Sequence, residues 1–256
     1  TGTGKTAAFT LPILQKLNAS QSTEKARDPK ALILAPTREL AIQINESIRK
    51  YGQFIALKHT VIFGGVKQGP QVKALERGMD IIVATPGRLL DLINQGFCSL
   101  NKIEFFVLDE ADRMLDMGFI RDVEKVVKIL PKKRQTLFFS ATMPETVIKL
   151  ANNILISPKQ VKVKSTLTPV ERIAQSVIVI DPKDKVLQLI TLLKEKDFNS
   201  AIVFTRTKHK ANRISQKLTA VNIDCEAIHS NKSQAARQRA LTVSYTHLTL
   251  PTRSYV

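Results

Sequence analysis

A short apolar segment that ends in a cluster of carboxylates constrains this chain more than any other feature. Residues 103–108 have the composition of a strand that is buried on both faces, and Asp109, Glu110 and Asp112 follow almost directly. Because unpaired carboxylates are too costly to bury within a sheet, we expect them at the carboxyl end of the strand. Ligands bind at that edge of open α/β sheets, and carboxylates there suit Mg²⁺ together with phosphate oxygens. A solvated acidic loop is the alternative that this segment alone leaves open.

Apolar segments with the length of strands alternate with helical patterns through the first 164 residues. Strands are predicted at residues 31–35, 60–63, 80–84, 103–108, 135–139 and 160–163, and helices at 7–17, 36–48, 89–93, 120–130 and 145–155. Glycines, hydroxyl side chains and arginines occur where these strands end. Among them, Ser140 and Thr142 can hydrogen-bond the acidic cluster. The alternation predicts a parallel α/β sheet with one functional edge.

The chain opens with the glycine-rich sequence T-G-T-G-K-T, which leads into a helical pattern. In such a loop, backbone N–H groups and the helix dipole can cradle phosphates. Lys5 would then reach the β- and γ-phosphates, and the Thr6 hydroxyl would bind Mg²⁺. The first part of this pattern and the strand that should precede it lie outside the chain, so the motif by itself is not decisive.

Three further segments place polar groups at the ends of predicted strands. Arg38 at a helix start opposes the helix dipole, which indicates an anion nearby, although a solvated arginine is the alternative. Gly64 and Gly65 permit a sharp turn or a close approach to a ligand. A hydroxyl and another arginine, Thr85 and Arg88, follow the next strand. All three segments therefore belong to the same predicted edge.

The charge and cysteine content narrow the class of protein. A net charge of +17 and an isoelectric point near 10.0 indicate a polyanionic partner such as nucleic acid, although a merely basic protein is the alternative. Cys98 and Cys225 have no metal-ligand spacing, as expected for reduced thiols in a cytosolic protein. No apolar run approaches the roughly 18 residues of a membrane span, and no secretory signal is visible.

The second half of the chain has a similar alternation. A linker is predicted at residues 165–172, and a second α/β unit begins at 173. Its predicted strands are 177–180, 201–204 and 227–228, and its predicted helices are 186–193, 208–218 and 234–241. From residue 242 the sequence becomes threonine-rich. We expect residues 242–256 to end the helix, to be poorly ordered and to be foreign to the domain.

Taken together, these segments resemble the DEAD-box RNA helicases. Six motifs stand in the family's order: T-G-T-G-K-T, P-T-R-E-L-A, F-G-G, T-P-G-R, V-L-D-E-A-D and S-A-T. The second half adds I-V-F-T-R-T-K and A-I-H, followed by Gln234 and Arg237. The resemblance covers residues 1–241, and segments such as D-E-A-D-R-M-L-D-M-G-F are most similar to the bacterial RhlE group.

The resemblance implies a fold and an activity. The fold is a RecA-like P-loop domain with a parallel sheet at residues 1–164, followed by a partial second RecA-like domain at 173–241. The implied activity is that of a cytoplasmic, ATP-dependent RNA helicase core with ATP and Mg²⁺ as cofactors. Such a core couples ATP binding and hydrolysis to RNA strand clamping and local duplex unwinding.

The resemblance also assigns roles to individual residues. The triphosphate is bound by Thr1, Gly2, Thr3, Gly4, Lys5 and Thr6, and Mg²⁺ by Thr6 and Asp109. The catalytic set is Lys5, Asp109, Glu110, Asp112, Ser140 and Thr142. In this set Glu110 deprotonates the attacking water, and Asp112 contacts the two hydroxyls and couples the nucleotide to domain closure. The RNA backbone is held, largely independently of base sequence, by Pro36, Thr37, Arg38, Gly64, Gly65, Thr85, Gly87, Arg88, Thr205, Arg206, Gln234 and Arg237.

The chain departs from the family pattern in three respects. The upstream glutamine motif that reads adenine is missing, and Ser230 stands where glycine is frequent. The A-R-G-x-D and H-R-x-G-R-x-G-R stretches, which supply arginine fingers, are also missing. We therefore interpret the chain as a fragment truncated at both ends that turns over ATP barely or not at all. A DNA translocase with the same core and a non-catalytic RNA-binding fragment are the alternatives.

Overall fold

The computed structural model describes residues 4–19, 28–162, 174–195 and 200–247. The chain divides into two compact units, Thr1–Gln160 and Val161–Val256. The predicted linker at 165–172 lies outside the described residues. None of the described helices is both long and apolar enough to cross a membrane.

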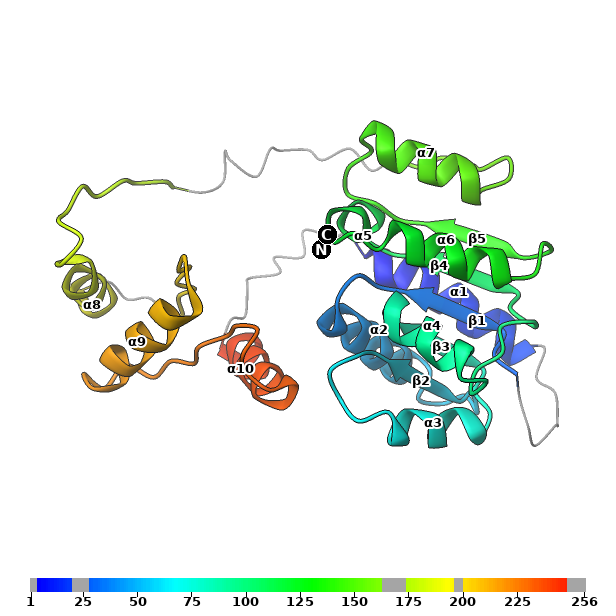
Figure 1. Ribbon diagram of the computed structural model, residues 1–256, viewed down its shortest axis with the longest axis horizontal. Helices are drawn as coiled ribbons and strands as arrows, with labels where there is room; N and C mark the ends of the chain where they lie inside the picture. Colours follow the sequence, from blue (N-terminus) through cyan, green and yellow to red (C-terminus); the bar gives the residue numbers. More distant parts are fainter. Residues whose placement is uncertain (1–3, 20–27, 163–173, 196–199, 248–256) are drawn as a thin grey trace. The chain divides into compact units, whose positions relative to one another are not determined.

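The first unit is built on a five-stranded parallel sheet with the order β2-β3-β1-β4-β5 (Figure 1). The strands are β1 (Ala31–Leu34), β2 (His59–Ile62), β3 (Ile81–Ala84), β4 (Phe105–Leu108) and β5 (Gln135–Phe138). In the central register, Ile33 lies between Val83 and Val107, so β1 is paired on both sides. β2 and β5 are the edge strands. The predicted parallel α/β sheet is therefore confirmed.

Helices cover both faces of this sheet. They are α1 (Lys5–Ala19), α2 (Arg38–Tyr51), α3 (Gly69–Glu76), α4 (Pro86–Asn94), α5 (Ala111–Asp116), α6 (Ile120–Ile129) and α7 (Glu145–Ile154). Because side chains alternate along a strand, Ile33 packs with α1 and α2, whereas Leu32 packs with α4, α6 and α7. Two buried apolar layers thus hold the strands in place and leave their carboxyl ends for polar groups.

The structure adds two short helices and removes one strand from the sequence-based prediction for this unit. Helix α3 begins with Gly69 and Pro70 and has few apolar residues, so its periodicity is weak. Helix α5 has six residues, too few to establish a period. The strand predicted at 160–163 is wrong, because residues 160–162 are not in a strand; residue 163 lies outside the described part. A strand needs a hydrogen-bonded neighbour, and no described segment pairs with these residues.

The second unit contains three helices in its described residues, and the other described segments form neither helix nor strand. The helices are α8 (Lys185–Glu195), α9 (Lys208–Thr219) and α10 (Gln234–His247), close to the predicted positions. The strands predicted at 177–180, 201–204 and 227–228 are wrong, because these segments form no ladder with any described residue. Their apolar side chains stay in solvent: Val179 and Phe204 are each 93% exposed.

Helix α10 also departs from the expectation for the end of the chain. It continues to His247, although the sequence-based prediction ends it at Leu241. No proline or glycine occurs between these positions, so nothing in the local sequence forces the helix to stop. The predicted helix end at residue 241 is therefore wrong, whereas poor order of the tail stays a prediction; residues 248–256 lie outside the described part.

Candidate nucleotide and RNA site

The carboxyl edge of the sheet in the first unit brings the predicted site residues together. Backbone hydrogen bonds continue past the strand ends: the Asp109 N–H donates to the Leu34 carbonyl (3.0 Å), and the Ala111 N–H donates to the Phe139 carbonyl (3.0 Å). The acidic segment is thereby fixed between its two neighbouring strands. Its position follows from the sheet itself and does not depend on a ligand.

A cavity of about 320 Å³ opens at this edge between α1, α2 and the acidic segment. Its lining includes Gly4, Lys5 and Thr6 from the start of α1, and Asp109 and Glu110 from the end of β4. Gly4 has φ +74°, a conformation that favours glycine, and its carbonyl accepts the first hydrogen bond of α1 from Ala8 (2.9 Å). The remaining lining residues are Ala7, Leu40, Gln43, Ser47 and Tyr51. Thr1, Gly2 and Thr3 lie outside the described residues.

The α2 wall of this cavity was not among the predicted site residues. Its members, Leu40, Gln43, Ser47 and Tyr51, recur every three or four positions and so share one face of the helix. Polar residues at that spacing on a helix that follows a core strand are the signal that could have identified them.

Asp109 is the most buried carboxylate at the site, with 4% of its surface exposed. Burial raises the pKa of Asp109, while the Glu110 N–H, which donates to its Oδ1 (3.0 Å), and the Lys5 charge act in the opposite direction. No group of three or more His, Cys, Asp or Glu side chains within the described residues is arranged to hold a metal ion. A buried carboxylate and a threonine that line the same cavity suit Mg²⁺ that is shared with phosphate oxygens, so Asp109 and Thr6 fit that ion.

Glu110 occupies a strained backbone position at the N-cap of α5. Its φ and ψ are 49° and 53°, the left-handed region, which costs a non-glycine residue roughly 1–3 kcal/mol. The Arg113 guanidinium pairs with its carboxylate (Nη1 to Oε2, 3.2 Å). Strain of this kind concentrates at functional sites, and Glu110 is one of the residues that line the cavity.

Asp112 joins α5 to the segment that follows β5. The Thr142 hydroxyl and N–H donate to Asp112 Oδ2 (2.8 and 2.9 Å). The Ser140 hydroxyl accepts from the Asp112 N–H (3.2 Å) and donates to the Thr142 carbonyl (2.6 Å). Although partial burial acts to raise the pKa of Asp112, these hydrogen bonds hold it below the usual value. The two hydroxyls thus bond the acidic cluster, as the sequence suggests they can.

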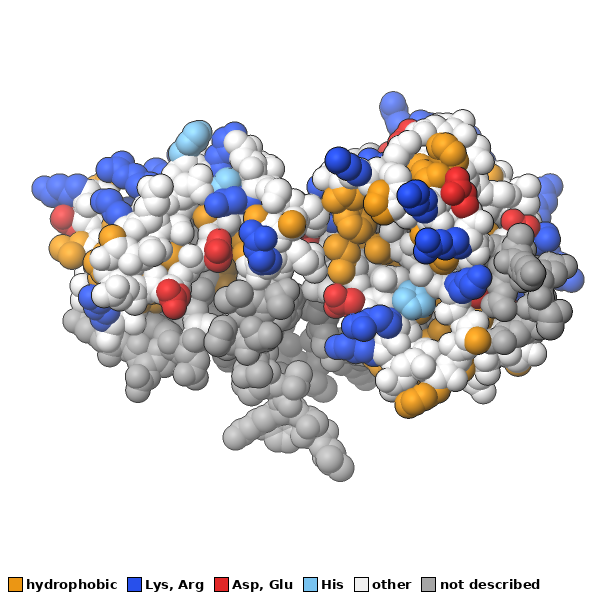
Figure 2. All heavy atoms as spheres, turned by 90° about the horizontal axis from the view of Figure 1, so that it is seen from below, with side chains coloured by type: hydrophobic (Ala, Val, Ile, Leu, Met, Phe, Trp, Pro, Cys, Tyr) orange, Lys and Arg blue, Asp and Glu red, His pale blue; other side chains and the backbone are white. Residues whose placement is uncertain are grey.

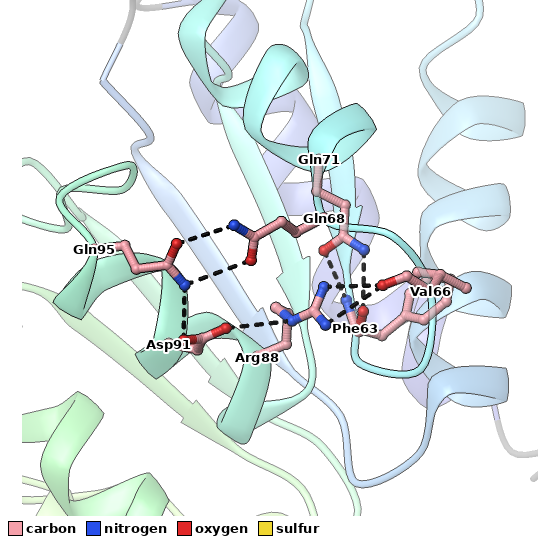
Figure 3. Close-up of polar contacts among 7 residues, drawn as sticks. All are labelled: Phe63, Val66, Gln68, Gln71, Arg88, Asp91 and Gln95. Atoms are coloured by element: carbon pink, nitrogen blue, oxygen red, sulfur yellow. Dashed lines mark hydrogen bonds and ion pairs between the residues drawn. The ribbon is translucent and has the colours of Figure 1, made fainter.

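The basic part of the edge is centred on the glycine pair after β2. Gly65 has φ +79°, and a Cβ there would collide with the Arg38 guanidinium, so only glycine allows this approach. On the other side, Arg88 Nη1 and Nη2 donate to the Val66 carbonyl (3.4 Å each), and Arg88 Nε pairs with Asp91 (3.6 Å) (Figure 3). Two guanidinium groups therefore flank one short loop.

The same loop presents backbone donors. The N–H groups of Gly64, Gly65 and Val66 make no hydrogen bond to any described residue. Successive free N–H groups beside positive side chains form a concave site for anions such as phosphate. Across the face shown in Figure 2, Lys and Arg side chains are widely distributed with few carboxylates among them, in keeping with the net charge of +17.

The other predicted RNA contacts in the first unit have structural surroundings of their own. Thr37 is the N-cap of α2, with its hydroxyl accepting from the Leu40 N–H (3.2 Å). Pro36 and Thr85 are buried, so their side chains shape the backbone at the edge more than they face solvent. Gly87 is exposed in the first turn of α4.

In the second unit, the predicted contacts lie near the starts of two helices. Thr205 and Arg206 precede α9, where the Thr205 hydroxyl donates to the Thr207 carbonyl (3.0 Å). Gln234 is the first residue of α10, and Arg237 lies in its first turn.

A parallel α/β sheet with a glycine–lysine–threonine helix start and a strand-end carboxylate facing one cavity defines a P-loop nucleotide-binding domain. Residues 1–150 match the DEAD/DEAH box helicase family, and the chain belongs to that family. It is 42% identical over 241 residues to the DEAD-box ATP-dependent RNA helicase CshA of Bacillus subtilis, covering 94% of this chain and 48% of that protein. It is 41% identical over 244 residues to the DEAD-box ATP-dependent RNA helicase 20 of Oryza sativa subsp. japonica, covering 94% and 49%.

A solved structure agrees with the assignment. The crystal structure of a DEAD box protein from the hyperthermophile Methanococcus jannaschii is similar with a TM-score of 0.60 and 37% identity, covering 96% of this chain and 64% of that one. This similarity and the parallel sheet confirm the predicted RecA-like α/β fold. The chain spans about half or less of the length of the curated relatives described above.

Proposed function

We propose that this chain carries the ATP- and RNA-binding core of a cytoplasmic ATP-dependent RNA helicase, related to the bacterial RhlE group. The observation that carries the proposal is the cavity that brings Lys5, Thr6, Asp109 and Glu110 together at one sheet edge. Relatives that bear the name ATP-dependent RNA helicase support it. In the whole protein, ATP binding and hydrolysis would be coupled to RNA clamping and local unwinding.

Each cavity residue has a chemical task in this proposal. The N–H groups at the start of α1 and the Lys5 ammonium bind and orient the triphosphate. Thr6 and Asp109 would hold Mg²⁺, which when bound neutralises charge on the phosphate oxygens. Glu110 orients the attacking water and accepts its proton. Phosphoryl transfer of this type depends mostly on positioning and on charge stabilisation, which such residues can supply.

The Asp112 hydrogen bonds extend this task to the neighbouring strand. They tie α5, which begins directly after Glu110, to Ser140 and Thr142 after β5. A change at the phosphates can therefore reach the segment after β5 without passing through the core. In the proposal this is the path by which the nucleotide affects domain closure.

RNA is proposed to bind through its phosphates. Arg38, Arg88 and the free N–H groups of the glycine loop provide donors that read no bases, so binding should be largely independent of sequence and sensitive to salt. Thr205, Arg206, Gln234 and Arg237 are proposed to hold the same strand in the whole protein.

Two other functions remain open to experiment. The first is a DNA translocase that uses the same core. The second is a non-catalytic RNA clamp, which is favoured by the absence of any sheet among the described residues of the second unit. Titration of the 256-residue chain with labelled RNA and with DNA of the same sequence, each with and without ATP and Mg²⁺, separates these functions. Tighter binding of DNA than of RNA contradicts the proposal. Equal RNA affinity with and without ATP favours the non-catalytic clamp.

A further inference from the structure

The loop that joins β2 to α3 is held at both of its ends by side-chain amides (Figure 3). At the first end, Gln71 Oε1 accepts from the Phe63 N–H (3.3 Å), and Gln71 Nε2 donates to the Phe63 carbonyl (3.0 Å). At the other end, the amides of Gln68 and Gln95 donate to each other (3.0 and 3.4 Å). Between these two attachments lie the glycine pair and Val66.

The Gln71 attachment occurs where the sheet itself offers no partner. The Ile62 carbonyl accepts from the Thr85 N–H (2.9 Å), so Ile62 faces the neighbouring strand and Phe63 faces the open edge of β2. A further strand would bond both backbone groups of Phe63, and the Gln71 amide does so in its place. Only 7% of Gln71 is exposed, so the pairing is largely shielded from water. Leaving such buried groups unpaired costs roughly 1–3 kcal/mol each.

The second attachment leads to an arginine that flanks the loop. Gln95 Nε2 also donates to Asp91 Oδ1 (2.8 Å), and Asp91 Oδ2 pairs with Arg88 Nε (3.6 Å). The Arg88 guanidinium donates in turn to the Val66 carbonyl. These contacts form a closed ring that starts and ends on the loop. The orientation of the guanidinium and the conformation of the loop are therefore set together.

We propose that Gln71 and Gln95 are positioning residues for RNA, an inference that rests on the proposed RNA-binding function. They hold the loop so that the free N–H groups of Gly64 and Gly65 and the Arg88 guanidinium face the same phosphate. A pair of glycines loses much conformational freedom when it is ordered. Because the amides order the loop before RNA arrives, less of the binding free energy is spent on ordering it.

The test compares three glutamine-to-methionine variants of the 256-residue chain. Gln71→Met and Gln95→Met keep the length of the side chain and remove its amide, and Gln53→Met makes the same change at an exposed site after α2 as a control. The dissociation constant for a fluorescently labelled single-stranded oligouridine is measured over a range of salt concentrations. ATP affinity and melting temperature are measured in parallel.

We expect Gln71→Met to weaken RNA binding by about tenfold. A loop that is no longer held should lose one charge-assisted hydrogen bond to the RNA phosphate, and a loss of that size corresponds to about tenfold in affinity. The slope of log affinity against log salt should become shallower by about 0.7, the value for one phosphate on a single strand. Gln95→Met should act in the same direction with a smaller effect, because Arg88 keeps its contact with Val66. Gln53→Met should bind as the unsubstituted chain does, and ATP affinity should be unchanged in all three variants.

The salt slope separates positioning from simple destabilisation. A variant that is only less stable binds with the normal dissociation constant and slope once its folded fraction is taken into account, and that result overturns the inference. If Gln71→Met does not fold, the exposed Gln95→Met variant decides, and an unchanged slope there is equally contradictory. If the unsubstituted chain binds no oligouridine, the proposed function fails and the inference fails with it. If it binds and the variants match it, the inference alone fails.

Discussion

The two units of this chain contain apolar segments of similar composition, which are buried in the first unit and exposed to solvent in the second. In the first unit, Ile33 and Phe106 lie in strands with neighbours, and both are almost completely buried. In the second unit, Val179 and Phe204 lie in segments that pair with no strand in the described part of the chain, and both side chains stay in solvent. The predicted helices of both units nevertheless form close to their expected places. Apolar composition therefore predicts a strand only where the backbone finds a partner, whereas a helix bonds within itself.

The largest expected effect is on the free energy of unfolding, and it tests the contrast between a buried and an exposed phenylalanine. Phe106→Ala should lower the free energy of unfolding by about 3–5 kcal/mol, because it leaves a cavity in a packed core. Phe204→Ala should change it by less than about 0.5 kcal/mol, because the side chain is already in water. Chemical denaturation followed by circular dichroism measures both. A large loss for Phe204→Ala would mean that the segment is buried in solution and that the contrast is wrong.

The second prediction concerns nucleotide binding, which we propose for the cavity of the first unit. Lys5→Ala should abolish measurable ATP binding, because it removes the cation at the start of α1 that faces the cavity. Lys16→Ala, an exposed change at the other end of α1, is the matched control and should bind normally. Isothermal titration calorimetry with ATP and Mg²⁺ provides the measurement. Equal affinity in the two variants would remove the phosphate-loop assignment.

The third prediction compares one arginine from each unit. Arg88→Gln and Arg206→Gln should each weaken binding of single-stranded RNA and make the salt dependence shallower by about 0.7. The reason is that each is proposed to neutralise one phosphate. Fluorescence anisotropy over a range of salt concentrations measures both. If Arg206→Gln binds like the unsubstituted chain, RNA binding in this polypeptide belongs to the first unit only.

The smallest expected effect is on the pH dependence of stability through Asp112. Its hydrogen bonds hold its pKa below the unfolded value, so its contribution is present above the unfolded pKa and is lost as pH falls through the folded one. Asp112→Asn should therefore lower stability at neutral pH, by less than about 1 kcal/mol after allowance for solvent screening, and have no effect in strong acid. Asp116→Asn on the same helix, at an exposed site, is the control. Denaturation midpoints across the acid range would show whether the difference persists.

These contrasts also show what the sequence could predict. The sheet edge could be predicted because its signals are local: a run of apolar residues, then carboxylates, glycines or arginines. The five strands and the main helices of the first unit follow from that pattern, and its six motifs led to the family. Hydrogen bonds between the two hydroxyls and the acidic cluster were expected from the same pattern, and the resemblance assigned them to Asp112.

Other features depend on packing between distant segments. The Gln71 amide can hydrogen-bond the Phe63 backbone only because α3 folds back along an edge strand. The periodicity of the sequence does not predict that arrangement. The left-handed conformation of Glu110 is set by bonds on both sides of the acidic segment. The strand predictions for the second unit were wrong for the opposite reason: the local signal was present, but no described residue provides a pairing strand.

The two edges of the sheet differ in a way that bears on handling the protein. At β2 the Gln71 amide occupies the outer side at Phe63, whereas β5 pairs only with β4, and no described residue extends the ladder on its other side. A bare edge is a template on which a second molecule can add a strand. At low ionic strength a charge of +17 keeps molecules apart, but at 0.15 M salt this repulsion reaches only about 8 Å. Colloidal stability should therefore decline as salt rises, so concentrated stocks should keep best in dilute buffer.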